Sequence, residues 1–460
     1  MESKLKFREK LCYGIGDFGS NMTSTFVGGF ILLYLTTAIG MNAGVVGTLM
    51  LVSKLFDGVT DIFFGTMVDH THTKMGKARP WMFWTNFLCG IGIIAVFSIP
   101  TSWGSTAQYA YFFITFTVLN AIFYTANNIA YSTISALMTT DGNERVQLGT
   151  FRYIFSMSSI VVITSTAVVL AENFGGGASG WRMAAVIAAV AEIIINTICV
   201  LGVKELPESV INEENAITDD NRKAEETDTS ASLGKTFITL LHNRFYLLIL
   251  AVYILFFLNT GVNSSVGAFF AKYILGNDAM LGTFMTAQMV PMIIGLFFTP
   301  MLVKKFGIYK VNLTAMGLSA VFCVPFVWAG YQGNVTLMLI LTALRGICGG
   351  PMNGTLNALI ADAGTYSYLK DGVHVEGSMF SCSSMGIKVG GGIGTAMAGW
   401  MLGAAGFDGL AEVQTAGALN MITVLYVVVP LAVFVLLTVC MWGMIIQKAI
   451  ERVKAEKSAK

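Results

Sequence analysis

The chain has 460 residues, of which 55% are hydrophobic and only 12% are charged. A water-soluble domain of this size needs a more polar surface, so the composition excludes an ordinary soluble protein and indicates a membrane protein with lipid as its solvent. The formal net charge of +1 gives no reason to expect a nucleic-acid partner. Seven cysteines are scattered singly, without a CxxC pair, and we interpret them as buried thiols and not as metal ligands or disulfides.

Apolar stretches long enough to cross a bilayer recur along the whole chain. A helix of roughly 20 residues spans about 30 Å of hydrocarbon, and no segment alternates in polarity like a strand of a membrane barrel. The N-terminal stretch is far too long for a signal-peptide core, so we expect it to be retained. The sequence predicts twelve membrane-spanning helices, at residues 11–37, 43–69, 80–100, 107–139, 150–172, 181–203, 244–275, 279–303, 310–329, 335–362, 377–405 and 416–446.

Lysine and arginine collect in alternate connections between these stretches, beginning with Lys4 to Lys10 and ending with Lys448 to Lys460. Cytoplasmic loops of membrane proteins carry an excess of these residues. The pattern predicts a multi-pass protein of the plasma membrane with both termini in the cytoplasm. This orientation requires an even number of spans, which twelve satisfies.

The predicted helices divide into two halves. A polar, mostly acidic segment at 204–243 is too polar to bury a core, so we interpret it as a cytoplasmic linker between the halves 1–203 and 244–446, with a tail at 447–460. The run GMNAGVVGTLM at Gly40 is echoed by GNDAMLGTFM at Gly276, each entering the second helix of its half. Parallel six-helix repeats are typical of the all-α major facilitator fold, in which the binding site lies at mid-membrane between the halves.

Two aspartates of the second predicted helix, Asp57 and Asp61, lie four residues apart and therefore share one face. Two carboxylates so close in a low-dielectric site repel each other, and a bound cation or a proton relieves the repulsion. Lys54 can supply a competing positive charge, and the hydroxyls of Thr60 and Thr125 can complete an oxygen shell for a hard cation. The pattern predicts a coupling site for Na⁺ or H⁺.

The alternative is that Asp57 and Asp61 are paired permanently with Lys54 and Lys388 and hold helices together. Lys388 lies among glycines in the run MGIKVGGGIG, which allows neighbouring backbones to approach and leaves its charge facing the interior. We therefore expect a carboxylate partner for Lys388.

Polar and aromatic side chains cluster in the first, fourth and fifth predicted helices. Their amides and charges can bind a polyhydroxy ligand at fixed angles, and two tyrosines offer faces for a sugar ring. For any single Asn or Tyr the alternative is a bond between helices. The predicted substrate residues are Asp17, Asn21, Tyr124, Asn127, Asn128, Tyr131 and Arg152, together with Lys388 of the eleventh predicted helix. The embedded Glu192 and Arg345 receive no firm role.

Four motifs together resemble the glycoside–pentoside–hexuronide:cation symporter family. They are YGIGDFGSN at Tyr13, DGVTDIFFGTMVDHTHTKMGKARPW at Asp57, NNIAYSTISALMTTDGNERVQLGTFR at Asn127, and ADAGTYSYLKDGVHVEGSMFS at Ala361. The similarity extends over nearly the whole chain apart from the linker and the tail. It implies a 12-helix fold, transport by alternating access, and sugar contacts mainly from the N-terminal helices.

The resemblance also implies roles for individual positions. Asp57 and Asp61 match the family's cation carboxylates, Thr60 and Thr125 match its neutral cation-site positions, Lys388 matches a conformationally important lysine, and Arg152 matches an arginine that lines the sugar site.

This chain departs from the family's best-known member at several positions. Asn21 and Asn128 replace acidic sugar-binding residues and Ser132 replaces a tryptophan, so galactoside specificity is not carried over. Removing two anions while keeping Arg152 and Lys388 makes an acidic sugar such as a hexuronide or glucuronide more tolerable. The loop before the eleventh helix also departs, at Thr365, Tyr368 and His374.

The sequence thus predicts a symporter that carries a sugar or glycoside together with a cation, Na⁺ or H⁺, and no other cofactor. Cation binding and sugar binding must strengthen each other equally. The basic loop of Lys74, Lys77 and Arg79 is expected to bond across helix ends and to steady the outward-facing state. A symporter of a non-sugar solute and a non-transporting sensor are the alternatives. An enzyme is disfavoured, because the chain has no HExxH or GxSxG motif.

Overall fold

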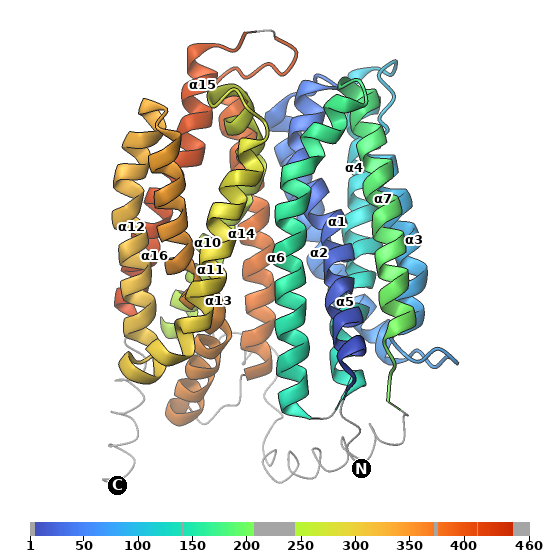
Figure 1. The fold of residues 1–460 in the computed structure, drawn as a ribbon, viewed down its shortest axis with the longest axis vertical. Coiled ribbons are helices and arrows are strands. Elements are labelled where there is room, and N and C mark those ends of the chain that lie inside the picture. Colours follow the sequence, from blue (N-terminus) through green and yellow to red (C-terminus); the bar gives the residue numbers. More distant parts are fainter. Residues whose placement is uncertain (1–4, 140, 207–243, 372–375, 412, 445–460) are drawn as a thin grey trace. The chain divides into compact units, whose positions relative to one another are not determined.

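The computed structural model describes residues 5–139, 141–206, 244–371, 376–411 and 413–444. All regular elements in these ranges are helices (Figure 1), apart from an isolated bridge between Thr73 and Gly76. The predicted all-α class is confirmed.

The helices follow the predicted apolar stretches closely. Long helices of this composition keep every backbone polar group bonded within its own segment, as a lipid environment requires. The first part of the chain forms α1 (Phe7–Thr37), α2 (Ala43–Asp69), α3 (Arg79–Val96), α4 (Ser105–Thr117), the π-helix η1 (Val118–Tyr124), α5 (Thr125–Met138), α6 (Gly142–Asn173) and α7 (Gly177–Gly202). The second part forms α10 (Arg244–Phe269), η2 (Phe270–Ile274), α11 (Met280–Phe306), α12 (Ile308–Gln332), α13 (Val335–Asp371), α14 (Glu376–Ala404), α15 (Ala416–Thr423), η3 (Val424–Val428) and α16 (Val429–Gly443).

Nine helical runs within the described residues are long and apolar enough to cross a membrane. Large apolar side chains on these runs are exposed, for example Phe297 (80% exposed) and Leu201 (67% exposed), which is expected of surfaces that face lipid chains. The protein is therefore a multi-pass membrane protein. The total of twelve spans stays a prediction.

The chain divides into two compact units, each considered by itself. Unit 1 comprises Met1–Thr227, Gly267–Gly282 and Ala396–Ala418, and unit 2 comprises Asp228–Val266, Thr283–Thr395 and Leu419–Lys460. In unit 1, α1 packs against both α6 and α7, and α3 packs against α7. In unit 2, α12 packs against α13 and α16. The predicted cation and sugar residues of the first five spans all belong to unit 1.

Small residues let α1 approach its neighbours in unit 1 closely. A Cβ atom at Gly16 would lie 2.5 Å from Sγ of Cys199 and 2.8 Å from a ring carbon of Tyr131, both of which are fully buried. At Gly28, on the same helix, a Cβ would meet nothing within 4 Å. Gly16 is therefore needed for helix packing, and Gly28 is not.

We expect Gly16→Ala to destabilise the protein by about 1–3 kcal/mol, because an added methyl group in a packed interior forces its neighbours to shift. Thermal unfolding in detergent, followed by tryptophan fluorescence, measures this as a lowered Tm. The matched control is Gly28→Ala, which should be neutral or slightly stabilising because Ala favours a helix by about 1 kcal/mol over Gly. Equal Tm values for the two variants would contradict the packing assignment.

The loop between α2 and α3 is fastened to the end of α7 by Glu205. The Glu205 carboxylate accepts hydrogen bonds from the backbone N–H groups of Lys77 (2.7 Å), Ala78 (3.1 Å) and Arg79 (2.9 Å). These are among the N–H groups that a helix start leaves without intrahelical partners, and a negative charge is favourable there. Glu205 therefore caps α3 from a distant part of the sequence.

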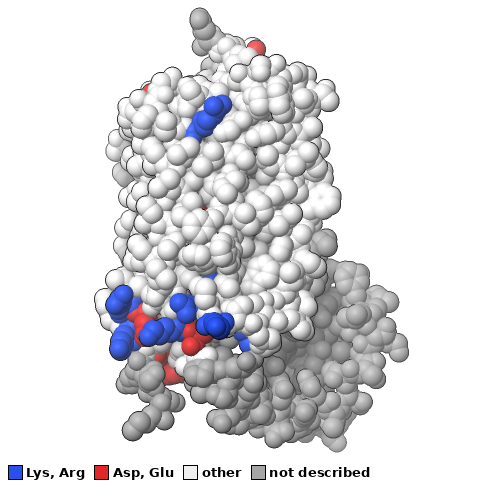
Figure 2. All heavy atoms as spheres, turned by 90° about the vertical axis from the view of Figure 1, so that its right-hand side faces the viewer, with Lys and Arg blue, Asp and Glu red and all other residues white. Residues whose placement is uncertain are grey.

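A second contact joins the same two helices. The Arg79 guanidinium donates to the carbonyl oxygen of Val200 at 2.9 and 3.0 Å, near the carboxyl end of α7. Lys74 and Lys77 line a neighbouring cavity of about 700 Å³ with Lys204. Figure 2 shows basic side chains gathered at one end of the visible face, with an almost uncharged surface above them. The contact of Arg79 with Val200 is a bond of the basic loop across helix ends, of the kind expected from the sequence. The sequence interpretation placed Glu205 in the linker and gave it no role.

We expect Glu205→Gln to lower the free energy of unfolding by about 1–3 kcal/mol, because a neutral amide oxygen caps α3 less strongly than a carboxylate. The measurement is Tm in detergent at two salt concentrations. Asp408→Asn, at an exposed carboxylate in the loop after α14, provides the control. A Tm change no larger than that of the control would show that the cap contributes little.

Candidate functional site

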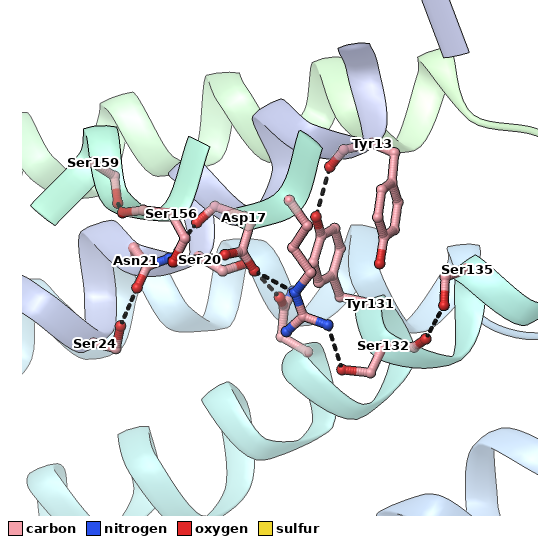
Figure 3. A network of polar contacts seen from close by, with 12 residues as sticks. Tyr13, Asp17, Ser20, Asn21, Ser24, Tyr131, Ser132, Ser135, Ser156 and Ser159 are labelled. Atoms are coloured by element: carbon pink, nitrogen blue, oxygen red, sulfur yellow. Dashed lines mark hydrogen bonds and ion pairs between the residues drawn. The ribbon is translucent and has the colours of Figure 1, made fainter. Parts of the chain in front are cut away.

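An ion pair inside unit 1 joins α1 to α6 (Figure 3). Nε of Arg152 donates to Oδ1 of Asp17 at 3.0 Å. The Asp17 side chain is 9% exposed, whereas that of Arg152 is 34% exposed. Charged groups in membrane-spanning helices are costly unless they are paired or face a polar cavity. Arg152 is thus both paired and partly accessible, as a ligand-binding group must be.

Asn21, one turn after Asp17 on α1, extends the same network. Its amide nitrogen donates to Oγ of Ser156 on α6 at 2.9 Å and to Oδ2 of Asp17 at 3.2 Å. Its amide oxygen accepts from Ser24 at 3.2 Å. The i, i+4 spacing places Asp17 and Asn21 on one face of α1, toward α6. Amide, hydroxyl and carboxylate groups therefore converge, as recognition of a polyhydroxy ligand requires.

Tyr131 of α5 contacts Arg152 through the face of its ring. Its hydroxyl donates to the carbonyl oxygen of Tyr13 at 2.6 Å, and the two rings stack with centroids 4.8 Å apart. Cζ of Arg152 lies 5.0 Å from the Tyr131 ring centroid, and Nη1 donates to Oγ of the exposed Ser132 at 3.3 Å. Tyr131 is 0% exposed. In this structure its ring thus faces protein groups, while Ser132 offers a hydroxyl at the surface.

The neighbouring asparagines of α5 differ in their surroundings. Asn127 is buried and donates to Oγ1 of Thr85 at 3.0 Å and to the carbonyl oxygen of Met82 at 3.2 Å. It therefore bonds between helices, the alternative that the sequence left open. Asn128 and Tyr124, predicted to contact substrate, are both half-buried, and Tyr124 lies within electrostatic range of Asp17. Their contact with substrate stays a prediction.

Two of the predicted cation-site residues meet between α2 and α5. The Thr125 hydroxyl donates to Oδ1 of the buried Asp57 and lies 2.9 Å from the carbonyl oxygen of Asn120. The π-helix η1 ends directly before Thr125, and π-helical turns often occur at functional sites. Thr60 donates to the backbone carbonyl of Asp57 at 3.1 Å, and Asp61 is half-buried. A carboxylate and a hydroxyl from different helices thus share one site, with oxygen ligands that suit a hard cation.

Sequence reasoning missed Ser53, one turn before Asp57 on α2. Ser53 is 0% exposed, and its hydroxyl has no hydrogen-bond partner within the described structure. A buried hydroxyl without a partner is unusual, and it can serve as an oxygen ligand for a hard cation. The signal that could have identified it is the spacing of Ser53, Asp57 and Asp61, each four residues apart.

In unit 2, the glycines around Lys388 allow the close helix approach that the sequence predicted. A Cβ at Gly390 would lie 2.4 Å from the carbonyl oxygen of Ile254, so α14 packs closely on α10. Lys388 itself is half-buried. Its predicted role beside the two aspartates stays a prediction, as does its predicted carboxylate partner.

Arg345, which had no role from the sequence, packs among aromatic rings in unit 2. Its Cζ lies 4.5 Å from the ring centroid of Phe326 and 5.6 Å from that of Phe434. Arginine over aromatic faces stabilises packing through cation–π attraction. The side chains of Thr365, Tyr368 and His374, which depart from the family pattern, lie outside the described residues.

Comparison with known proteins identifies the family of the chain. Residues 12–448 match the family model described as MFS/sugar transport protein. The isoprimeverose transporter of Lactiplantibacillus pentosus is 30% identical over 440 residues, covering 94% of this chain and 87% of that protein. A putative glycoside/cation symporter of Escherichia coli (strain K12), YagG, is 23% identical over 439 residues, covering 94% of this chain and 90% of that protein.

A solved structure supports the fold. The crystal structure of a D-xylose-proton symporter superimposes with a TM-score of 0.62 at 13% sequence identity, covering 95% of this chain and 97% of that one. At this identity the likeness shows the fold alone, which is the major facilitator fold. Together with the family match, which covers nearly the whole chain, it identifies a transporter and not an enzyme. The chain belongs to the MFS/sugar transport protein family, and within it to the glycoside–pentoside–hexuronide:cation symporters, which carry a sugar together with a cation.

Proposed function

We propose that this symporter carries an uncharged glycoside or pentoside, bound by the network around Asp17 and Arg152. The structural observation that supports this is the 3.0 Å ion pair between these two residues. The positive charge of Arg152 is already balanced by Asp17. A sugar carboxylate at Arg152 would therefore lie beside a second carboxylate, and like charges at such short range disfavour each other.

A hexuronide is the second candidate, and one observation favours it. About a third of the Arg152 side chain is accessible (34%), so the guanidinium retains donors that a carboxylate could accept from. Asn21 and Asn128 add no negative charge.

The name of one relative supports the first candidate. Isoprimeverose, for which the 30% identical relative is named, is an uncharged sugar.

The coupling cation, Na⁺ or H⁺, binds at Asp57, Asp61 and Thr125 in this proposal, with Thr60 beside them. The contact of Thr125 with Asp57 supports the site because it brings α2 and α5 together around one carboxylate. Cation binding relieves the repulsion between the aspartates and orders the neighbouring helices, which raises the affinity for sugar. By thermodynamic linkage, the sugar raises the affinity for the cation by the same factor.

The proposal includes twelve spans in two halves, 1–203 and 244–446, in the plasma membrane with both termini cytoplasmic. The distribution of lysine and arginine supports the orientation. Transport then proceeds by alternating access, as the halves rock about a central site. Lys54, Lys388 and the loop of Lys74, Lys77 and Arg79 act in coupling and gating in this scheme.

Proteoliposomes test the coupling. We expect labelled glycosides or pentosides to accumulate when a Na⁺ gradient or a pH gradient is imposed, and the gradient that drives uptake identifies the ion. Asp57→Asn and Asp61→Asn should each abolish accumulation while the protein stays folded, because the amide removes the charge that binds the cation. Concentrative uptake that survives in both variants would contradict the proposed cation site.

A second experiment tests the substrate class. Asp17→Asn keeps a hydrogen-bond acceptor for Arg152 but removes the opposing charge, so uptake of a glucuronide relative to its neutral glycoside should rise about tenfold, equivalent to ~1.4 kcal/mol. The readout is competition by each sugar in a counterflow assay. Asp408→Asn, in the loop after α14, is the control. An unchanged ratio would contradict the view that Asp17 excludes acidic sugars.

A further inference from the structure

A buried acid lies between α1 and α7, away from the site described above. Glu192 of α7 is 1% exposed, and its carboxylate accepts a hydrogen bond from Oγ1 of Thr23 on α1 at 2.6 Å. Within the described residues, no lysine, arginine or histidine forms an ion pair with it. A carboxylate that is buried with one neutral partner is strongly disfavoured as an anion.

The neighbours of Glu192 are polar and incompletely bonded. Asn196, one turn later on α7, is 1% exposed, and neither atom of its amide group has a partner within the described structure. Asn86 of α3 is 0% exposed and donates to the carbonyl oxygen of Ile193 at 3.1 Å, while its own amide oxygen lacks a partner. Buried polar groups are nearly always bonded, so several such atoms together require an explanation.

Among the described residues of the elements packed against α7, no side chain forms an ion pair with Glu192. The titratable group of α3 that faces Glu192 is the thiol of Cys89, and α1 contributes the neutral hydroxyl of Thr23, which does not titrate. The charged Asp17 of α1 is bonded to Arg152 of α6. The surroundings thus favour the protonated acid in this conformation.

We propose that Glu192 is a proton-binding site of the transport cycle, with the unpartnered amide group of Asn196 and the unpartnered amide oxygen of Asn86 as its hydrogen-bonding environment. It takes a proton from a hydronium ion, leaving water, before the α1–α7 interface closes around it. It returns the proton to water when that interface opens. This inference rests on the proposed symport function but is separate from the site at Asp57 and Asp61.

The geometry of α1 connects this proton site to the sugar network. Asp17 and Asn21 lie on the face of α1 toward α6, and Gly19 and Thr23 lie on the face toward α7. A Cβ at Gly19 would lie 2.8 Å from Oδ1 of Asn196, so the two helices are in close contact at this level. Loss of the proton from Glu192 would place an anion in this interface and disfavour the closed packing of α1. Sugar binding and proton binding are then linked, and each strengthens the other equally.

Glu192→Gln tests this inference, because the amide imitates the protonated acid in shape and cannot titrate. In proteoliposomes we expect the rate of sugar counterflow at equal pH to stay within about twofold of wild type, because the amide keeps the shape of the protonated acid. A twofold change is small beside the tenfold change that corresponds to about 1.4 kcal/mol. Accumulation driven by a pH gradient should fall at least about tenfold on the same scale, and the pH dependence of counterflow should flatten. Asp408→Asn, at an exposed carboxylate in the loop after α14, is the control and should behave as wild type.

A second measurement on the wild-type protein covers the case in which the variant does not fold. Addition of sugar to the purified protein, in lightly buffered detergent at a pH high enough to deprotonate Glu192, should cause proton uptake and should restore the infrared band of a protonated carboxylic acid. Proton uptake that is absent from the wild type, or pH-driven accumulation in Glu192→Gln equal to wild type, would overturn the inference. Wild-type protein that exchanges no sugar at any pH would overturn the proposed function itself.

Discussion

The ion pair between Asp17 and Arg152 is the interaction on which the candidate sugar site depends. Each charge is tolerated inside a membrane protein because the other lies 3.0 Å away, so removing one would leave the other uncompensated. Arg152 also contacts the ring of Tyr131 and the hydroxyl of Ser132. One guanidinium therefore fixes the relative positions of α1, α5 and α6.

Other polar contacts also join pairs of helices in unit 1, where apolar contacts alone would not specify which helices pack together. Lipid chains are as apolar as Leu, so close packing and hydrogen bonds decide which helices associate. Thr125 and Asp57 join α5 to α2, Thr23 and Glu192 join α1 to α7, and Glu205 caps α3 from the end of α7. Each of these contacts includes a carboxylate as the acceptor.

α1 connects the proposed functions because its two faces serve different partners. One face carries Asp17 and Asn21 into the network with α6, and the opposite face packs Gly19 and Thr23 against α7. Gly19 allows α1 and α7 to approach closely one turn from the contact between Thr23 and Glu192. A symporter needs such a link between ion and solute, since neither affinity can change without the other.

The sequence by itself determined the helical class, the positions of the helices and the family, because apolar length and the motifs are local properties of the chain. It also placed Thr125 with Asp57, through the resemblance. The tertiary structure decided what the sequence left open: Tyr131 is fully buried under Arg152, Asn127 bonds between helices, and Arg345 packs on aromatic rings. It also showed that the buried hydroxyl of Ser53 lacks a partner within the described residues, that Glu192 accepts a hydrogen bond from Thr23, and that Glu205 accepts one from the backbone of Lys77. The reason is physical: the partner of a buried polar group depends on the rotation and approach of helices that are distant in sequence, and neither hydrophobic pattern nor spacing specifies these.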